Sequence, residues 1–401
     1  MRAIDLHYKE EYSLYILVLL LGLIYCYISF PFEKQPTFLF YSGTLVSSMA
    51  CIYVSENTER KYIKHFFFWL GMAIIGYPMA FRLADGMDVL KYRQIFENAQ
   101  YFSKVTSYFR TSGQERGYLF LNWWFCRFVS KDYNHFQVFI VYLTHIFWGI
   151  AFRKNSNMKG SGMFMVLFLW SHLYFFTLSA GLLRIFMALS ITFIALQYLW
   201  KDQWKWFLIW LILAAFIHLS CLVMLLFLVF FYKKDWFYKH WLLFVVISFF
   251  VVLVALFTMA RFLIPIMGDK YEGYGNVSNI NFSLGCFTTL PIWLLCYIYY
   301  KNLPTTSIDY KKKYIIGMIL ISLSIIFSIA STAVHVGRII YYAYLGLLIV
   351  VSAIFQIRTR HYSDILLKCL LIIYSLVYVM VTTLTNYRIT RLFPYESFLS
   401  E

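Results

Sequence analysis

Residues 204–232 read WKWFLIWLILAAFIHLSCLVMLLFLVFFY, and this stretch decides how the chain folds. As one helix it would be about 43 Å long, whereas the hydrocarbon core of a bilayer is about 30 Å thick. As two complete crossings it would give about 14 residues each, too few to span. Basic residues flank both ends, so we expect a re-entrant pair of half-helices whose tip is residues 217–220 (IHLS). Such broken helices persist where protein or a cavity surrounds them. One long tilted helix is the alternative.

The whole chain shares this apolar character. Of its 401 residues, 61% are hydrophobic, 22% are aromatic and only 13% are charged, whereas a soluble domain has about 25% charged residues. This composition excludes an ordinary soluble enzyme, a disordered chain and a disulfide scaffold, and the continuous apolar runs disfavour a β-barrel. The sequence predicts an all-α polytopic transmembrane helix bundle of about 11 to 13 spans, with residues 1–401 forming a single integral membrane domain.

Apolar runs of spanning length recur along the chain. We expect membrane spans at residues 12–31, 36–54, 63–81, 135–153, 163–178, 182–200, 240–262, 284–301, 313–332, 337–356 and 364–385. The first run is expected to stay in the protein, because no small-residue cleavage site follows it. The one large hydrophilic stretch, residues 82–134, is predicted to be an extracytoplasmic loop that contains an amphipathic helix at 117–129.

Basic residues outnumber acidic ones, 35 to 19, which gives a formal net charge of +16. Many occur in short connectors between apolar runs, a pattern that marks the cytoplasmic side of a membrane protein. The connectors are residues 60–64, 153–159, 201–205, 233–239, 311–313 and 358–360. The N-terminus is therefore predicted to be cytoplasmic and the C-terminus extracytoplasmic.

Two kinds of partner are not expected. Basic and aromatic residues do not interleave on a hydrophilic stretch as they do on a nucleic-acid-binding surface, so no nucleic-acid partner is expected. The 7 cysteines form no CxxC pair and have no histidine at the spacing of metal ligands. Neither a metal site nor a disulfide framework is therefore expected.

Polar side chains that interrupt the apolar pattern are expected to gather at the outer ends of the spans. They are Arg82, Asp85, Asp88, Tyr92, Glu115, Arg184, His218 and Arg338. An ionisable residue that faces the interior of a helix bundle is a functional candidate. Each also has a structural interpretation. Arginines near helix ends reach to lipid headgroups, the two aspartates cap a loop helix, and His218 satisfies backbone groups at the helix break.

The chemistry of these residues points to a lipid diphosphate that carries sugars. The guanidinium groups of Arg184 and Arg338 match diphosphate oxygens, because an arginine presents a planar fork of donors. Carboxylates take protons from sugar hydroxyls or bind them, and Asp85 and Asp88 would share one face of a helix. The candidates for the general base are His218, Asp85, Asp88 and Glu115. The histidine leads, because an imidazole titrates near neutral pH.

Three patches, in this order, resemble the EpsG family of short Wzy-type bacterial polysaccharide polymerases. The first is RLADGMDVLKYRQIF (82–96), followed after a gap by ERGY (115–118). The second is GLLRIFMA (181–188), followed by AAFIHLS (214–220). The third is GRIIYY (337–342), with PY (394–395) near the C-terminus. The chain departs from the family pattern at Ile185, which stands in place of a glutamine, and at Ile217, which separates Phe216 from His218.

The resemblance implies a membrane glycosyltransferase, similar to GT-C-like enzymes, that polymerises lipid-linked oligosaccharide repeat units. The growing glycan would pass from undecaprenyl diphosphate to a sugar hydroxyl of the next unit, at the outer face of the bacterial cytoplasmic membrane and without a cofactor. The implied substrate-binding residues are Arg82, Tyr92, Arg184, Arg338 and Tyr342. The implied partners are undecaprenyl-diphosphate-linked oligosaccharide and the lipid bilayer. Whether a chain-length regulator protein is a further partner is left open.

Three other functions fit parts of the pattern. An O-antigen ligase-like transferase would bind the same donor and use another acceptor. A flippase for lipid-linked oligosaccharide would favour an internal repeat and a central cavity, and the sequence has no repeat of fixed period. A membrane O-acyltransferase would also place a histidine in the membrane, but the surplus of outer arginines suits a diphosphate better than an acyl thioester.

Overall fold

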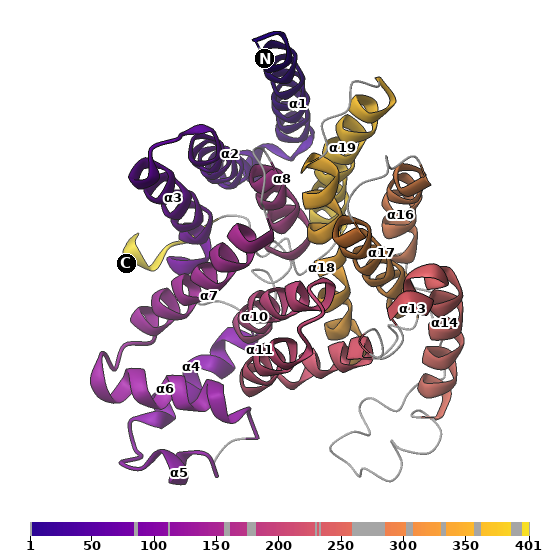
Figure 1. Ribbon diagram of the computed structural model, residues 1–401. Helices are drawn as coiled ribbons and strands as arrows, with labels where there is room; N and C mark the ends of the chain where they lie inside the picture. Colours follow the sequence, from indigo (N-terminus) through magenta and orange to yellow (C-terminus); the bar gives the residue numbers. More distant parts are fainter. Residues whose placement is uncertain are drawn as a thin grey trace.

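The computed structural model describes residues 2–83, 87–110, 113–155, 161–174, 182–228, 231, 234–258, 285–301, 308–329, 334–356, 362–385 and 395–400. Within these ranges the chain is a bundle of helices (Figure 1). The helices of its first half are α1 (Arg2–Ser29), η1 (Phe32–Lys34), α2 (Gln35–Asn57), α3 (Lys61–Ala80), α4 (Met87–Ala99), α5 (Val105–Tyr108), α6 (Arg116–Phe128), α7 (Tyr133–Asn155), α8 (Ser161–Phe168) and η2 (Leu169–Tyr174). Those of the second half are α10 (Leu183–Trp200), α11 (Trp204–Ile217), η3 (Leu219–Leu228), α13 (Lys234–Lys239), α14 (Trp241–Thr258), α16 (Gly285–Lys301), α17 (Ile308–Ile329), α18 (Val334–Gln356), α19 (Tyr362–Thr385) and η6 (Phe398–Ser400).

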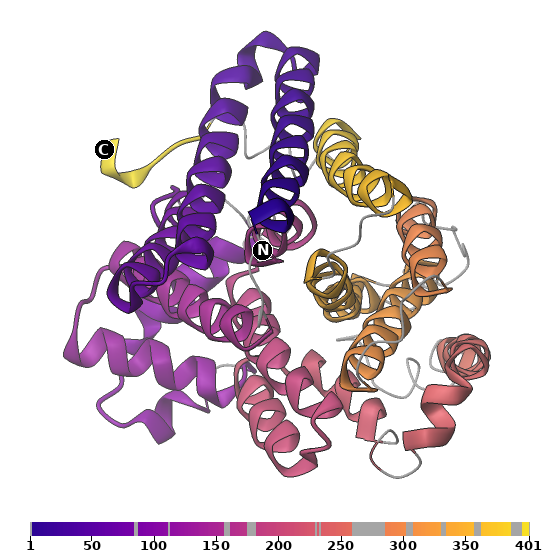
Figure 2. The same cartoon turned by 45° about the horizontal axis from the view of Figure 1, so that its top comes forward.

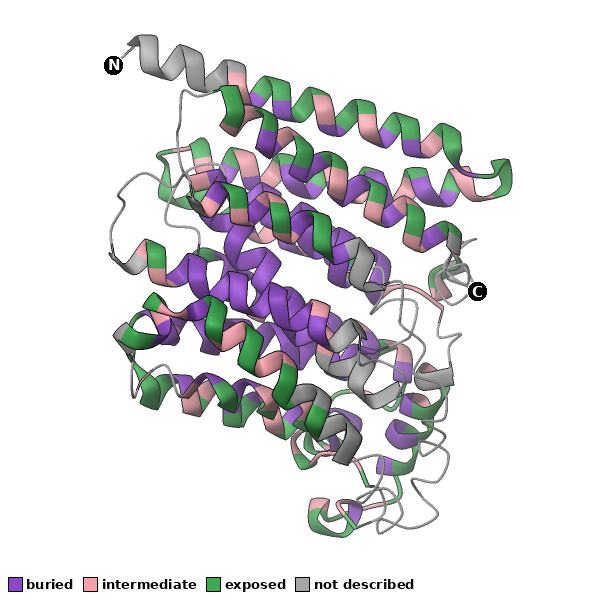
Figure 3. Cartoon of the chain, turned by 90° about the vertical axis from the view of Figure 1, so that its right-hand side faces the viewer, coloured by how far each residue is buried: buried purple, intermediate pink, exposed green. Residues whose placement is uncertain are grey.

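The prediction of an all-α polytopic bundle is confirmed. Among the described residues, 5 helices are long and apolar enough to cross a membrane, and shorter apolar helices accompany them. Exposed leucine, isoleucine and phenylalanine side chains cover outer faces such as those of α1 and α14. Buried residues concentrate on the central helices, and exposed residues lie along the outer helices (Figure 3). A bundle that is apolar on its outside as well as its inside suits a lipid environment.

Helix α10 lies at the centre of the bundle (Figure 1), with 89% of its residues buried. Its apolar residues are packed on every side, which explains why this span carries almost no exposed surface. Helices α7 and α11 pack against it, and α17 and α18 contact it from the C-terminal half. The N-terminal helix α1 and the C-terminal helix α19 lie side by side (Figure 2). In the C-terminal half, α17 and α18 cross at Gly317 and Gly346, where an added Cβ on Gly346 would lie 2.5 Å from the Gly317 carbonyl oxygen. Small residues allow this close helix crossing.

The apolar run at residues 204–232 is broken at the predicted tip, residues 217–220. Helix α11 ends at Ile217, His218 has an extended backbone, and the 3-10 helix η3 begins at Leu219. The two halves fold back on each other, because the Cys221 thiol donates to the Leu211 carbonyl at 3.6 Å and the rings of Phe207 and Phe231 are 5.9 Å apart. A single long helix would keep these pairs far apart, so the alternative of one tilted helix is excluded.

Three of the basic connectors lie at one end of the bundle. Lys312 forms an ion pair of 3.1 Å with Asp202, and Lys313 donates to the Asn155 carbonyl at 3.1 Å. Arg153 lies over the ring of Phe68, 5.5 Å from its centroid. These contacts join the connectors around residues 153–159, 201–205 and 311–313, and bring the α3 helix to the same end. Helices α7 and α10 both run to this end from the opposite one, where the large loop lies.

The large loop is itself helical. Residues 87–128 contain α4, α5 and α6, and α6 matches the predicted amphipathic helix at 117–129. The Trp123 indole N–H donates to the Phe102 carbonyl at 2.9 Å, which ties α6 to the segment before α5. The loop therefore presents a packed surface to the bundle.

Candidate functional site

The ion pair between Arg184 and Glu115 is the centre of the candidate site. Arg184 lies in the first turn of α10, and its Nη1 atom donates to Glu115 Oε2 at 2.5 Å. The two side chains are 8% and 14% exposed. The positive end of the α10 dipole disfavours a cation in its first turn. A buried guanidinium there needs a close anion, and the loop supplies one from 69 positions earlier in the chain.

Two tyrosine rings of the loop also lie against the guanidinium. The Arg184 Cζ atom is 5.0 Å from the centroid of the Tyr92 ring and 5.2 Å from that of Tyr118. The two rings contact each other edge to face, 5.6 Å apart. Tyr92 lies on α4 and Tyr118 on α6. The electron-rich faces of their rings add cation–π attraction to the ion pair.

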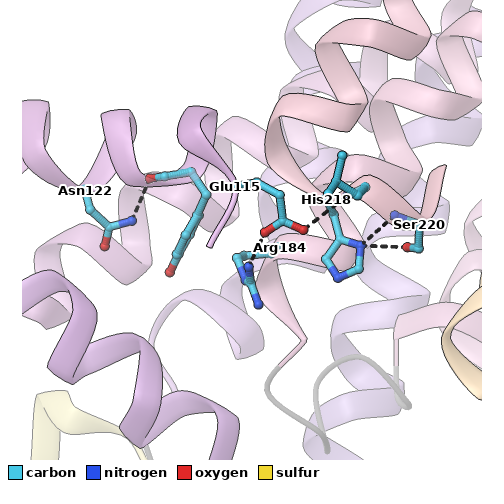
Figure 4. A network of polar contacts seen from close by, with 7 residues as sticks. Glu115, Asn122, Arg184, His218 and Ser220 are labelled. Atoms are coloured by element: carbon cyan, nitrogen blue, oxygen red, sulfur yellow. Dashed lines mark hydrogen bonds and ion pairs between the residues drawn. The ribbon is translucent and has the colours of Figure 1, made fainter. Parts of the chain in front are cut away.

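Glu115 also joins the loop to the pair of helices α11 and η3. It precedes α6 but makes no capping hydrogen bond to that helix. Instead its Oε1 atom accepts the backbone N–H of Leu219, the first residue of η3, at 3.1 Å. His218 serves the same helix, because its Nδ1 atom accepts the Ser220 backbone N–H at 3.3 Å. Two side chains thus satisfy N–H groups that the start of a helix leaves without partners. Figure 4 shows this arrangement.

The capping contact fixes which nitrogen of His218 carries the proton. A backbone N–H can only donate, so the Nδ1 atom that receives it must be an acceptor. The Ser220 hydroxyl lies 2.6 Å from the same atom and is a second donor to it. The neutral imidazole therefore carries its proton on Nε2. In this arrangement Nδ1 of His218 accepts from Ser220, and Nε2 is the donor nitrogen of the ring.

Two buried donors beside the ion pair lack partners within the described part of the chain. They are Arg184 Nε and the Tyr118 hydroxyl. Arg184 is 7% exposed and Tyr118 is 1% exposed. Burial raises the pKa of the Tyr118 phenol well above its usual range, so the phenol stays neutral and remains a donor. Buried donors are nearly always paired, so an unpaired guanidinium N–H and an unpaired phenol on neighbouring side chains indicate a place for an acceptor-rich ligand.

Gly117 lets the loop approach the helix break. A Cβ atom built on Gly117 would lie 2.6 Å from the Phe216 carbonyl oxygen, closer than any real side chain approaches. The start of α6 therefore packs directly on the end of α11, and this contact sets Glu115 beside Leu219. Asn122 adds support further along α6, where its amide donates to the Tyr118 carbonyl at 2.7 Å (Figure 4).

The structure brings several of the predicted site residues together. Glu115, Arg184 and Tyr92 are in direct contact, and His218 joins them through the start of η3. Tyr342, on α18, is fully buried and lies beside Ser220. The order of the patches in the sequence gave no sign of these distances, but their common location at the outer span ends was predicted.

Arg82 has a different neighbourhood. Its backbone pairs with Ser397 in an isolated antiparallel bridge, and the next residue, Leu83, donates to the Glu396 carbonyl at 2.8 Å. The C-terminal segment therefore lies across the end of α3. Tyr395 anchors that segment, with its ring 4.5 Å from the ring of Phe40.

Three predicted residues have undescribed side chains. Asp85 lies outside the described residues altogether. Asp88 lies in the first turn of α4, and Arg338 lies on α18, but the structure describes only their backbone. Their proposed roles stay predictions. Within the described ranges, no group of three histidine, cysteine, aspartate or glutamate residues is arranged to hold a metal ion.

The sequence assigned no role to Gly117 or Ser220, which the structure places in the site, and it indicated Tyr118 only as an aromatic residue suited to a sugar face or to headgroup depth. Ser220 follows His218 by two positions, which is the spacing of a side-chain cap with the second N–H of a helix. That signal was present in the sequence. Gly117 gave no such signal, and the contact of Tyr118 with Arg184 could not be predicted, because both depend on how α6 packs against α10 and α11.

Fold and site together define a polytopic α-helical membrane protein with a buried guanidinium–carboxylate pair at one end of its bundle. The EpsG family matches residues 65–397, and the chain belongs to this family. The resemblance read from the three patches is confirmed. Comparison with curated proteins found no match, and comparison with solved structures found none either. Family membership associates the chain with polysaccharide biosynthesis and a polymerase-like role.

Proposed function

We propose that the protein polymerises lipid-linked oligosaccharide repeat units, with Arg184 binding the diphosphate of the donor. One observation carries the proposal: the buried Arg184 guanidinium and the Leu219 N–H at the start of η3 both donate to the Glu115 carboxylate, while Arg184 Nε and the hydroxyl of the neighbouring Tyr118 have no partner in the described part of the chain. A carboxylate and a phosphate oxygen present the same charge and similar acceptor geometry to such donors. A diphosphate has enough acceptor oxygens to use all of them.

The reaction follows from the leaving group. The growing glycan is transferred from undecaprenyl diphosphate to a sugar hydroxyl of the next unit, and negative charge develops on the departing diphosphate. Arg184 stabilises that charge with fixed donors in a site screened from bulk water. His218 donates its Nε2–H to the same group or to a sugar oxygen. Tyr92 and Tyr118 hold the guanidinium in place, and Tyr118 adds its hydroxyl as a donor.

The site faces the outside of the cytoplasmic membrane in this proposal. It lies at the end of α7 and α10 opposite the cluster of basic connectors, and basic connectors favour the cytoplasmic side. The lipid tail of the donor would remain in the bilayer while its sugars extend outward. Arg338 and Asp88 are proposed as further diphosphate and sugar contacts, as their place in the family pattern implies.

A reconstituted assay tests the proposal. The purified protein is placed in liposomes with undecaprenyl-diphosphate-linked repeat units and no nucleotide sugar, and products are separated on a gel. A ladder spaced by one repeat unit is expected from the wild type, and no ladder from Arg184→Lys, which keeps the charge but lacks the planar fork. Units moved across the liposome membrane without a ladder would overturn the proposal in favour of a flippase. Transfer of units only to a different added acceptor would overturn it in favour of a ligase.

A further inference from the structure

Glu115 occupies the position that the proposed function gives to the diphosphate. Its Oε2 atom accepts a hydrogen bond from the Arg184 guanidinium, and its Oε1 atom accepts one from the Leu219 N–H. Both oxygens are engaged, so in this state the carboxylate has no free role in proton transfer. A donor diphosphate reaches the same donors only if the carboxylate moves away.

We propose that Glu115 is exchanged for the donor diphosphate at Arg184 and Leu219, and that the released carboxylate is the general base. This inference rests on the proposed function and deepens it by assigning the base and the order of events. Binding of the donor frees Glu115, so the base becomes available only when the diphosphate is in place. Without donor, the carboxylate remains paired, which protects the site from idle proton transfer.

Two independent observations support exchange over a fixed ion pair. The first is that Arg184 Nε and the Tyr118 hydroxyl stay without partners while Glu115 is bound, so the carboxylate satisfies only part of the donor set. The second is that Glu115 precedes α6 and spends no hydrogen bond on capping it. Its side chain can leave without uncapping the loop helix. The N–H of Leu219 at the start of η3 then receives a phosphate oxygen instead.

The other candidates in the described part of the chain fit the role of base less well. His218 uses Nδ1 to accept from Ser220 and carries its proton on Nε2, so it is set to donate. Glu115 is the carboxylate in contact with the diphosphate position. After exchange it remains near the sugar that the diphosphate carries, where it can take the proton of an acceptor hydroxyl.

The chemical step then balances. The acceptor hydroxyl gives its proton to the Glu115 carboxylate as its oxygen bonds to the anomeric carbon of the donor. The bond between that carbon and the diphosphate oxygen breaks, and the electron pair leaves with undecaprenyl diphosphate. The carboxylic acid formed on Glu115 loses its proton to water when the products separate.

The first test compares diphosphate affinity in two variants. Glu115→Gln keeps an oxygen for the Leu219 N–H but removes the charge that competes for Arg184. Glu97→Gln is the matched control, because Glu97 is an exposed carboxylate on α4 of the same loop. Binding of undecaprenyl diphosphate to each protein in nanodiscs is measured by titration.

The expected result for Glu115→Gln is an affinity about tenfold higher than wild type, because a charge-assisted competitor is gone, with no polymer made. Glu97→Gln should match the wild type in its affinity for undecaprenyl diphosphate and in its polymer yield. Equal or weaker affinity in Glu115→Gln would overturn the exchange, and full polymer yield from it would overturn the role as base. If the wild type makes no ladder but Glu115→Gln still binds more tightly, the exchange holds and the polymerase function fails.

A second measurement uses the wild type and does not depend on how a variant folds. Glu115 is labelled with a water-soluble carbodiimide and an amine, and the modified peptide is quantified by mass spectrometry. Adding undecaprenyl diphosphate should raise labelling of Glu115 several-fold and leave Glu97 unchanged. Unchanged or reduced labelling of Glu115 would show that the diphosphate does not displace it, and would overturn the proposal.

Discussion

At the scale of single residues, His218 uses Nδ1 to cap η3, and the proposed function assigns Nε2 to the ligand. Asparagine keeps an acceptor near the position of Nδ1 and so preserves the cap on η3, but it has nothing at Nε2. Glutamine reaches towards Nε2 and loses the cap. We expect the free energy of unfolding of His218→Asn to lie within about 0.5 kcal/mol of the wild-type value, because the cap is kept. The variant should nevertheless make no polymer.

The comparison with His218→Gln completes this prediction. The free energy of unfolding of His218→Gln should be about 1 kcal/mol lower than that of the wild type, because the cap is lost. Thermal unfolding in detergent and the reconstituted polymer assay measure the two properties separately. Normal polymer yield from His218→Asn would show that Nε2 takes no part in the reaction.

Tyr118 gives a second prediction at this scale. Its hydroxyl is buried without a partner in the described part of the chain, a state that costs about 1–3 kcal/mol. Tyr118→Phe keeps the ring over Arg184 and removes the unpaired group. The variant should therefore be as stable as the wild type or more so, while its polymerisation rate falls about tenfold because one donor to the diphosphate is lost.

The measurements for Tyr118→Phe are the unfolding temperature and the initial rate at saturating donor. A variant that loses stability would mean that the hydroxyl has a structural partner. A variant that gains stability and keeps its full rate would remove the hydroxyl from the site.

The sequence indicated some of these residues and not others for a physical reason. An arginine, a glutamate and a histidine stand out in a chain that is 13% charged, so Arg184, Glu115 and His218 were visible. A tyrosine does not stand out by its type among 34, so Tyr92 and Tyr342 were indicated only by the resemblance to the EpsG family. The pairing of Glu115 with Arg184 could not be predicted either, because it depends on how the loop packs rather than on spacing.

At the scale of elements, the packing of α6 on the end of α11 sets the site. Gly117→Ala introduces a Cβ that would meet the Phe216 carbonyl oxygen at 2.6 Å, so the two helix ends must separate. We expect a loss of about 1–3 kcal/mol of stability, as overpacking typically costs. Polymer yield should fall by more than the loss of folded protein explains, because Glu115 moves away from Leu219.

Gly113→Ala is the matched control for that variant. Gly113 lies in the same loop, and an added Cβ there meets no atom within 4 Å. Unfolding and polymer yield of Gly113→Ala should equal those of the wild type. If Gly117→Ala also behaves like the wild type, the contact between α6 and α11 does not set the site.

The elements also show where sequence reasoning stops. The break in residues 204–232 was predictable, because length and flanking charge left few solutions. The 3-10 form of η3 was not predictable, since long runs of this form are uncommon. The loop helix at 117–129 was expected from its amphipathic pattern, whereas its contact with α10 came only from the fold.

At the scale of the whole molecule, the orientation in the membrane is the open prediction. Single cysteines are introduced at Glu97 in the loop and at Lys61 in a basic connector of a cysteine-free variant. Both positions are exposed. In intact cells a membrane-impermeant maleimide should label the cysteine at 97 and not the one at 61, which should react only after permeabilisation. The reverse pattern would place the site on the cytoplasmic side.

The general architecture followed from composition and run length alone. Each predicted span has a helix at its position within the described residues; residues 175–178, 259–262, 284 and 330–332 of these spans lie outside the described ranges. The sequence could not predict which of these helices are buried at the centre of the bundle, because side chains that face lipid and side chains that face the core are equally apolar. Only the fold identifies α10 as the central helix.

The most direct test is the distance between Arg184 and the bound diphosphate. Protein with nitrogen-15 in its arginine side chains is reconstituted with undecaprenyl diphosphate, and solid-state NMR measures the coupling between phosphorus and guanidinium nitrogen. A spectrum of Arg184→Lys, subtracted from that of the wild type, isolates Arg184. We predict a phosphorus–nitrogen distance of about 4 Å, which corresponds to a direct hydrogen bond. A difference spectrum without coupling would contradict the claim that Arg184 holds the diphosphate.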